Sequence, residues 1–242
     1  MTFNSLGRPP ASYAIFPRWP AVFISSVEQA LQESWCALLQ HYPKVIATRD
    51  EDKITEALVE IMIDLRKNES VPGFTPAFFG VPTRDAKHRD WTGKWIDQMP
   101  DMKVPLAVPR PEVAHDNHDA MFFECKVLFG KRQLRLYGDE GMERFVDGRY
   151  AWCMPHGHMV AFVLQAPSDQ PYSALTTHFA RTRGKPPRTN GYRLAVVDSP
   201  TIVEPSACAY ARDIVETKHL RAAPMLASGQ NRVVLRHLWL CT

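Results

Sequence analysis

The run "AMFFECKVLF", residues 120–129, places one acid and one base inside an otherwise apolar segment. Its length and its aromatic and branched side chains predict a β-strand in the middle of a sheet. Because side chains of a strand alternate between its two faces, Glu124 and Lys126 should share one face and Cys125 should lie on the other. Unpaired buried charge costs several kcal/mol, so both charged side chains require a partner or a metal ion.

The acid-x-Lys triplet is by itself a weak signal, because it occurs five times, starting at residues 51, 85, 101, 124 and 216. Position distinguishes the triplets: only E-C-K lies at the centre of a strand apolar enough to be central in a sheet. Asp101 opens a second candidate strand, and the 22 residues between Asp101 and Glu124 suffice for two adjacent strands and a turn. Asp97 precedes the same strand and is the alternative second acid, but the strand pattern begins at Asp101.

Two carboxylates that converge from adjacent strands form an oxygen-rich site, which suits Mg²⁺ or Mn²⁺. Lys126 would then neutralise a phosphate or position the attacking water. A divalent ion, a polarised water and an ammonium are the parts needed to hydrolyse a phosphodiester. The competing interpretation is a structural ion pair on a half-exposed strand, in which Glu124 contacts Lys126 and no carboxylate from the preceding strand approaches them.

The order of expected elements indicates a single mixed α/β domain over residues 1–242, with an N-terminal arm and helix (1–49), a catalytic core (50–165) and a C-terminal extension (166–242). Residues 70–93 are expected to form a long loop. Helices are expected at 26–43, 50–68, 139–151 and 173–182, and strands at 101–108, 120–129, 158–165, 192–197, 213–221 and 232–240.

Composition is that of an ordinary globular protein, with 45% hydrophobic and 23% charged residues and a net charge of +3 that would tolerate a polyanion. The five cysteines are scattered and never spaced C-x-x-C, which favours free thiols in a reducing cytosol. The N-terminus lacks the layout of a signal peptide, and no apolar run approaches membrane-spanning length. We therefore expect a soluble cytoplasmic protein without membrane contact.

Pro100-Asp101 followed by Glu124-Cys125-Lys126 resembles the PD-(D/E)xK nuclease superfamily. The resemblance implies the restriction-endonuclease-like fold, whose core is helix, three strands, helix, strand. It also implies hydrolysis of DNA phosphodiesters with Mg²⁺ or Mn²⁺, leaving a 5′-phosphate. Asp101, Glu124 and the Cys125 backbone carbonyl would hold the metal, and Lys126 would orient or activate the water.

Members of this superfamily often place a metal-holding glutamate on the first core helix. On a helical wheel Glu51 lies beside the apolar face of its helix, whereas Glu56 and Glu60 point away from that face. Glu51 is therefore the residue that matches the family pattern.

A longer pattern, "ECKVL", "YGDEGMERFVDGRYA", "HGHMVAFV", "KHLR" and "RHLWL", resembles a group of uncharacterised or defence-associated bacterial proteins over roughly residues 50–242. This implies a role in restriction or anti-phage defence, beside partner proteins of a defence operon. The alternative is a non-hydrolytic nuclease-fold subunit that binds nucleic acid or acts as an effector. Cutting both strands with one site per chain would favour a homodimer.

Basic residues supply candidate contacts to nucleic acid. Arg144 either pairs with Glu140 four residues earlier on its helix or lies over the scissile phosphate. A basic loop is expected either to track a nucleic-acid backbone or simply to be solvated, and its candidates are Arg181, Arg183, Lys185 and Arg188. The histidine and cysteine clusters at residues 115–118 and 153–158 match no structural zinc spacing.

Overall fold

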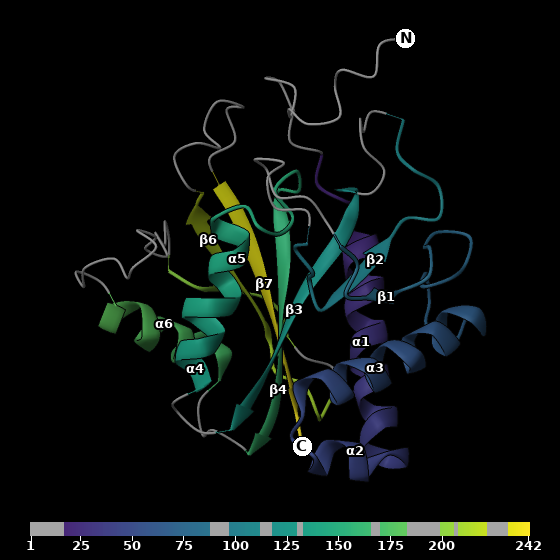
Figure 1. Cartoon of the computed structure of the whole chain (residues 1–242), viewed down its shortest axis with the longest axis horizontal. Helices are drawn as coiled ribbons and strands as arrows, with labels where there is room; N and C mark the ends of the chain where they lie inside the picture. The colour runs from purple at the N-terminus through teal and green to yellow at the C-terminus, as the bar shows by residue number, and fades with distance from the viewer. Residues whose placement is uncertain are drawn as a thin grey trace.

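A mixed seven-stranded sheet with strand order β1-β2-β3-β4-β7-β6-β5 forms the centre of the protein in a computed structural model (Figure 1). The structure describes residues 17–87, 97–111, 118–129, 133–165, 170–182, 199–205, 208–221 and 232–242. The strands are β1 (Thr83–Arg84), β2 (Met102–Pro105), β3 (Ala120–Phe129), β4 (His156–Gln165), β5 (Thr201–Glu204), β6 (Ile214–Leu220) and β7 (Arg232–Cys241). The α/β class expected from the sequence is confirmed.

The sheet combines antiparallel and parallel pairing. Strands β1, β2 and β3 are antiparallel neighbours, and β3 pairs in parallel with β4. The connection from β3 to β4 includes a helical segment made of α4 (Gln133–Leu136), the π-helical turn η2 (Tyr137–Met142) and α5 (Glu143–Val146). Strand β7 is parallel to β4, and β6 and β5 complete that side as antiparallel strands.

Helices cover both faces of the sheet. The remaining helices are α1 (Ala21–His41), α2 (Pro43–Ala47), α3 (Glu51–Lys67) and α6 (Pro171–Thr182). Trp35 of α1 stacks on Phe162 of β4 with ring centroids 5.4 Å apart, whereas Phe145 of α5 lies against Gly157 of the same strand. Residues 157 and 162 point to opposite faces of β4, so α1 and α5 sandwich the sheet, as Figure 1 shows.

Helix α3 begins where the sequence predicts it, and its start fixes the place of Glu51. The Asp50 side chain accepts hydrogen bonds from the backbone N–H groups of Asp52 and Lys53 at 3.1 and 3.3 Å, which is an N-cap. Acids in the first turn and Arg66 and Lys67 in the last turn suit the helix dipole. Glu51 is consequently the first residue of the helix.

Several predicted boundaries are wrong for identifiable reasons. Helix α1 begins at Ala21 rather than at residue 26, because Ser26 is a buried residue within the helix and not its cap. The helix predicted at 139–151 occupies 133–146, since Gly148 takes a left-handed conformation with φ of 80° just after Val146. The expected strand over residues 101–108 ends at Pro105.

The other differences concern short elements or residues outside the described ranges. The loop expected at 70–93 contains the two-residue strand β1, and β5 was not predicted. The strand predicted at 192–197 lies outside the described residues. All five cysteines are free thiols, as expected. Across the part of the chain that the structure describes, no helix combines the length and apolar character needed to cross a membrane.

Candidate active site

Two carboxylates accept backbone hydrogen bonds from the part of β3 that has no β2 residue beside it. The register that pairs Met102 with Phe123 brings Asp101, just before β2, beside Glu124. Asp101 Oδ2 accepts the backbone N–H of Cys125 at 2.7 Å, and Glu51 Oε2 accepts that of Val127 at 3.1 Å. The side chains thus replace the carbonyls that a longer β2 would supply, which fixes both acids at the edge of β3.

The Lys126 ammonium lies at the centre of the acidic residues. Its Nζ is 2.7 Å from Glu51 Oε1, 2.8 Å from Glu124 Oε1 and 3.9 Å from Asp101 Oδ2. It also donates to the backbone carbonyl of Cys125 at 2.8 Å. Glu51, Asp101, Glu124 and the Cys125 carbonyl therefore surround one cation. The simple ion-pair interpretation expected the contact between Glu124 and Lys126, but its expectation that no carboxylate from the preceding strand approaches them is wrong.

Arg144 of α5 is the second cation at Glu124. Its Nη1 donates to both carboxylate oxygens, at 2.7 and 2.9 Å, and the Arg144 side chain is 29% exposed. The helix-stabilising pair with Glu140 is not formed. Glu140 is exposed, and the π-helical turn Tyr137–Met142 ahead of α5 changes the ordinary helical spacing between the two residues.

Close packing explains why a glycine stands at residue 141, the second position of the E-G-x-x-R-F pattern. A Cβ atom at Gly141 would lie 3.3 Å from Glu124 Cγ and 2.6 Å from Met159 Cε. The absence of a side chain lets the helical segment approach β3 and β4 closely. Arg144, three residues later, then reaches Glu124, while Phe145 packs on Gly157 of β4.

Burial and mutual repulsion perturb the acids. Burial and the charge of Glu124 raise the pKa of Asp101 to about 7, although Lys126 and the Cys125 N–H oppose this shift. Burial also raises the pKa of Glu124, despite Lys126 and Arg144. Burial alone would lower the pKa of Lys126, but Glu124, Asp101 and Glu51 raise it above its ordinary value, so the amine is cationic at neutral pH.

Tyr150 is a site residue that sequence reasoning missed. Its hydroxyl donates to the backbone carbonyl of Met99 at 2.6 Å and accepts from Arg144 Nη1 at 3.0 Å. Tyr150 follows α5 in an irregular segment where no periodicity applies. The only signal was its place at the end of the "YGDEGMERFVDGRYA" block.

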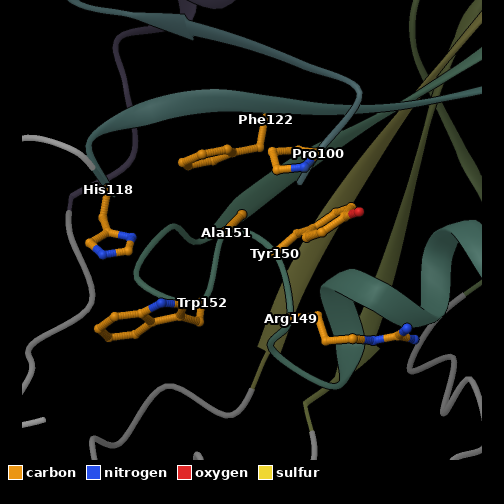
Figure 2. Close-up of a pocket in the computed structure, with 7 residues that line it drawn as sticks. All are labelled: Pro100, His118, Phe122, Arg149, Tyr150, Ala151 and Trp152. Carbon is orange, nitrogen blue, oxygen red and sulfur yellow. The ribbon is translucent and has the colours of Figure 1, made fainter. Parts of the chain in front are cut away.

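A narrow pocket is lined by the site residue Tyr150 (Figure 2). Pro100, which precedes Asp101, lies on the same side of this pocket as Tyr150. The pocket is also lined by the buried aromatic side chains of Phe122 and Trp152, which are 2% and 8% exposed. The other lining residues are His118, Arg149 and Ala151.

The donor set suits a hard divalent cation. Glu51, Asp101, Glu124 and the Cys125 carbonyl offer oxygen only, as Mg²⁺ and Mn²⁺ prefer. These oxygens are spaced around an ammonium, however. Within the described ranges, no group of three or more His, Cys, Asp or Glu side chains is arranged to hold a metal ion as it stands. Binding a metal would require Lys126 to move.

The other residues selected from the sequence lie elsewhere. Asp97 pairs with Lys87 at 2.9 Å with 66% of its side chain exposed, so Asp101 is the acid that joins the cluster. Arg181 belongs to the last turn of α6, and its side chain is not described. Arg183, Lys185 and Arg188 lie outside the described residues.

Comparisons with family models, with curated proteins and with solved structures found no match for this chain. The interpretation of the site therefore depends on its own geometry.

Proposed function

We propose that this protein is a metal-dependent endonuclease that hydrolyses DNA phosphodiester bonds with Mg²⁺ or Mn²⁺. One observation carries the proposal: three carboxylates and a backbone carbonyl from α3, β3 and the start of β2 converge on the ammonium of Lys126. A single ion pair needs only one acid. When Glu51, Asp101 and Glu124 are ionised they outnumber Lys126 and Arg144, so the cluster retains one negative charge to attract a cation.

The arrangement of elements supports the same proposal. Helix α3, strands β1, β2 and β3, the helical segment at residues 133–146 and strand β4 follow one another in the order of a restriction-endonuclease-like core. The two acid-bearing strands β2 and β3 are antiparallel neighbours in the sheet. A role in bacterial restriction or anti-phage defence, with partner proteins, rests on the sequence resemblance alone.

Each residue of the site would have a separate role in the reaction. Glu51, Asp101 and Glu124 would hold the metal, which when bound would acidify a water and neutralise charge on the phosphate. Lys126 would orient the attacking water, or stabilise the negative charge that develops on phosphate oxygens. Arg144, which is partly exposed, would contact a non-bridging phosphate oxygen.

Cleavage of plasmid DNA and of short single strands with Mg²⁺, Mn²⁺ or EDTA tests the proposal. We expect metal-dependent cutting by the wild type and loss of at least about a hundredfold in rate for Glu124→Gln and Lys126→Ala. Glu56→Gln and Lys67→Ala are matched controls, because both residues are exposed on α3. Cutting that survives in Glu124→Gln would refute the assignment of this site.

A second candidate is a nuclease-fold subunit that binds nucleic acid without hydrolysis. It is favoured by one observation, that Lys126 and Arg144 already satisfy both oxygens of Glu124. This candidate predicts nucleic-acid binding by every variant above and no cutting with any metal. A filter-binding or gel-shift measurement on the same proteins separates the two functions.

A further inference from the structure

The structure assigns a positioning role to Tyr150: its hydroxyl holds the Asp101 segment and Arg144 in register with Glu124, so that the carboxylates can share one divalent cation. This inference rests on the proposed function and names a residue that the sequence resemblance does not include. The Tyr150 hydroxyl is hydrogen-bonded to neither Asp101 nor Glu124. It acts through Met99 and Arg144.

The hydroxyl joins the two sides of the site. On one side it donates to the carbonyl of Met99, two residues before Asp101, at 2.6 Å. On the other side it accepts from the same Arg144 Nη1 that donates to Glu124. Because β2 has its first paired residue at Met102, this bond is an anchor for the chain that carries Asp101 into the site. Burial raises the pKa of the Tyr150 phenol, so the hydroxyl remains a donor at neutral pH.

Hydrogen bonds from a residue at the end of β6 hold the segment that carries Tyr150. The buried Arg221, just after β6, donates through Nη2 to the carbonyls of Ala151 and Met154 at 2.9 and 2.5 Å. The Tyr150 N–H also bonds to the Arg144 carbonyl at 2.8 Å. Because Arg221 is only 3% exposed, it acts as a scaffold for this segment. Tyr150 therefore extends from a rigid base.

The ring and the hydroxyl of Tyr150 make different contacts, so a substitution that removes only the hydroxyl can test the positioning role. The ring lines the pocket, and the Arg144 guanidinium carbon lies 5.5 Å from its centroid, in the range of a cation–π contact. Figure 2 shows the hydroxyl pointing away from His118 and Trp152 at the far end of that pocket. Tyr150→Phe consequently removes the two hydrogen bonds while keeping the buried ring.

The test compares Tyr150→Phe with Tyr137→Phe. Tyr137 is another buried tyrosine whose hydroxyl is hydrogen-bonded, but to His237 rather than to the site. Mn²⁺ binding is measured by calorimetry and by the rise in Tm with Mn²⁺ concentration, and cleavage rates are measured over the same range. Circular dichroism and Tm in EDTA establish that each variant is folded, and all assays run well below the lowest Tm.

We expect Tyr150→Phe to raise the half-saturating Mn²⁺ concentration about tenfold, with a rate at saturating Mn²⁺ within about threefold of wild type. Tyr137→Phe should lower Tm and leave the Mn²⁺ half-point unchanged. An unchanged half-point in Tyr150→Phe, beside a responsive wild type, would overturn the positioning role and leave the proposed function standing. A wild type that shows neither Mn²⁺ binding nor cleavage would overturn both.

Discussion

Asp101 acts as a strand neighbour for Cys125, because its carboxylate accepts the Cys125 backbone N–H at 2.7 Å. The bond holds the acid in a partly buried place beside another acid, where ionisation is unfavourable. The pKa of Asp101 is correspondingly raised to about 7 from an ordinary value of 3.8.

This shift makes Asp101 destabilising as the pH rises. In the folded state the Asp101 carboxyl keeps its proton up to about pH 7, whereas in the unfolded state it releases the proton near pH 4. The free energy of unfolding therefore falls as the pH rises between these values. Asp101→Asn keeps an acceptor for Cys125 and removes the charge. We expect its free energy of unfolding to match that of wild type below pH 4 and to exceed it by up to roughly 4 kcal/mol at pH 8 without metal.

Chemical unfolding at pH 4, 6 and 8 in EDTA measures this difference. The buried histidines, whose pKa values are lowered, give the opposite pH slope, but they are common to both proteins and cancel in the comparison. Glu56→Gln, at an exposed position of α3, is the control. A constant gap between Asp101→Asn and wild type at all three pH values would contradict the shift.

Arg144 competes with a metal for Glu124. Arg144→Met leaves the fully buried Glu124 with Lys126 as its one cationic partner among the described residues, which should cost about 3 kcal/mol of unfolding free energy in EDTA. Mg²⁺ should restore more stability to this variant than it adds to wild type, because the carboxylate is less neutralised. Urea titrations with and without Mg²⁺ provide the measurement, and Arg135→Met, exposed on α4, is the control. An equal Mg²⁺ effect in both proteins would show that the ion does not bind at Glu124.

Two glycines that face the same helical segment should respond differently to alanine. A Cβ at Gly157 would fall onto the ring of Phe145, which cannot yield, whereas a Cβ at Gly141 would meet the flexible end of Met159. Overpacking costs roughly 1–3 kcal/mol, so we expect Gly157→Ala near the upper value and Gly141→Ala near the lower. Gly141→Ala should nevertheless reduce cleavage more than its stability loss explains, since it also displaces Glu124. Thermal unfolding and cleavage rates of the two variants check this order.

The basic segment after α6 is predicted to bind the nucleic-acid backbone. Replacing Arg183, Lys185 and Arg188 with alanine should weaken binding of DNA of any sequence and reduce the slope of log affinity against log salt by up to about three. Fluorescence anisotropy with a labelled duplex and a labelled single strand at several salt concentrations gives both quantities. An unchanged slope would mean that the segment is only solvated.

Local sequence patterns correctly predicted those features of the site that are set within a single helix or strand. The apolar run at 120–129 is β3 residue for residue, and the helical wheel selected Glu51, whose carboxylate reaches Lys126. Alternation of side chains placed Glu124 and Lys126 together, and they lie 2.8 Å apart. Each of these inferences used only the period of a strand or a helix.

The parts that depend on tertiary packing could not be predicted. Arg144 binds Glu124 instead of Glu140 because a π-helical turn, which no periodicity announces, alters the helix ahead of it. The helical segment at Gly141, which covers the face of β3 that carries Glu124, could not be placed from the sequence. Tyr150 acts through the backbone carbonyl of Met99. Every residue has such a carbonyl, so the sequence cannot show which one accepts this hydrogen bond.

The early end of β2 also governs how this protein can change over evolution. Alanine at residue 51 or 101 would leave a backbone N–H of β3 unsatisfied, so that loss is opposed by folding itself. Glutamine or asparagine would keep the hydrogen-bond acceptor and discard only the charge, which at residue 101 opposes folding at neutral pH. Under the proposed function, lineages that have ceased to cleave DNA should therefore change at these positions toward amides, and a retained negative charge would mark selection for catalysis.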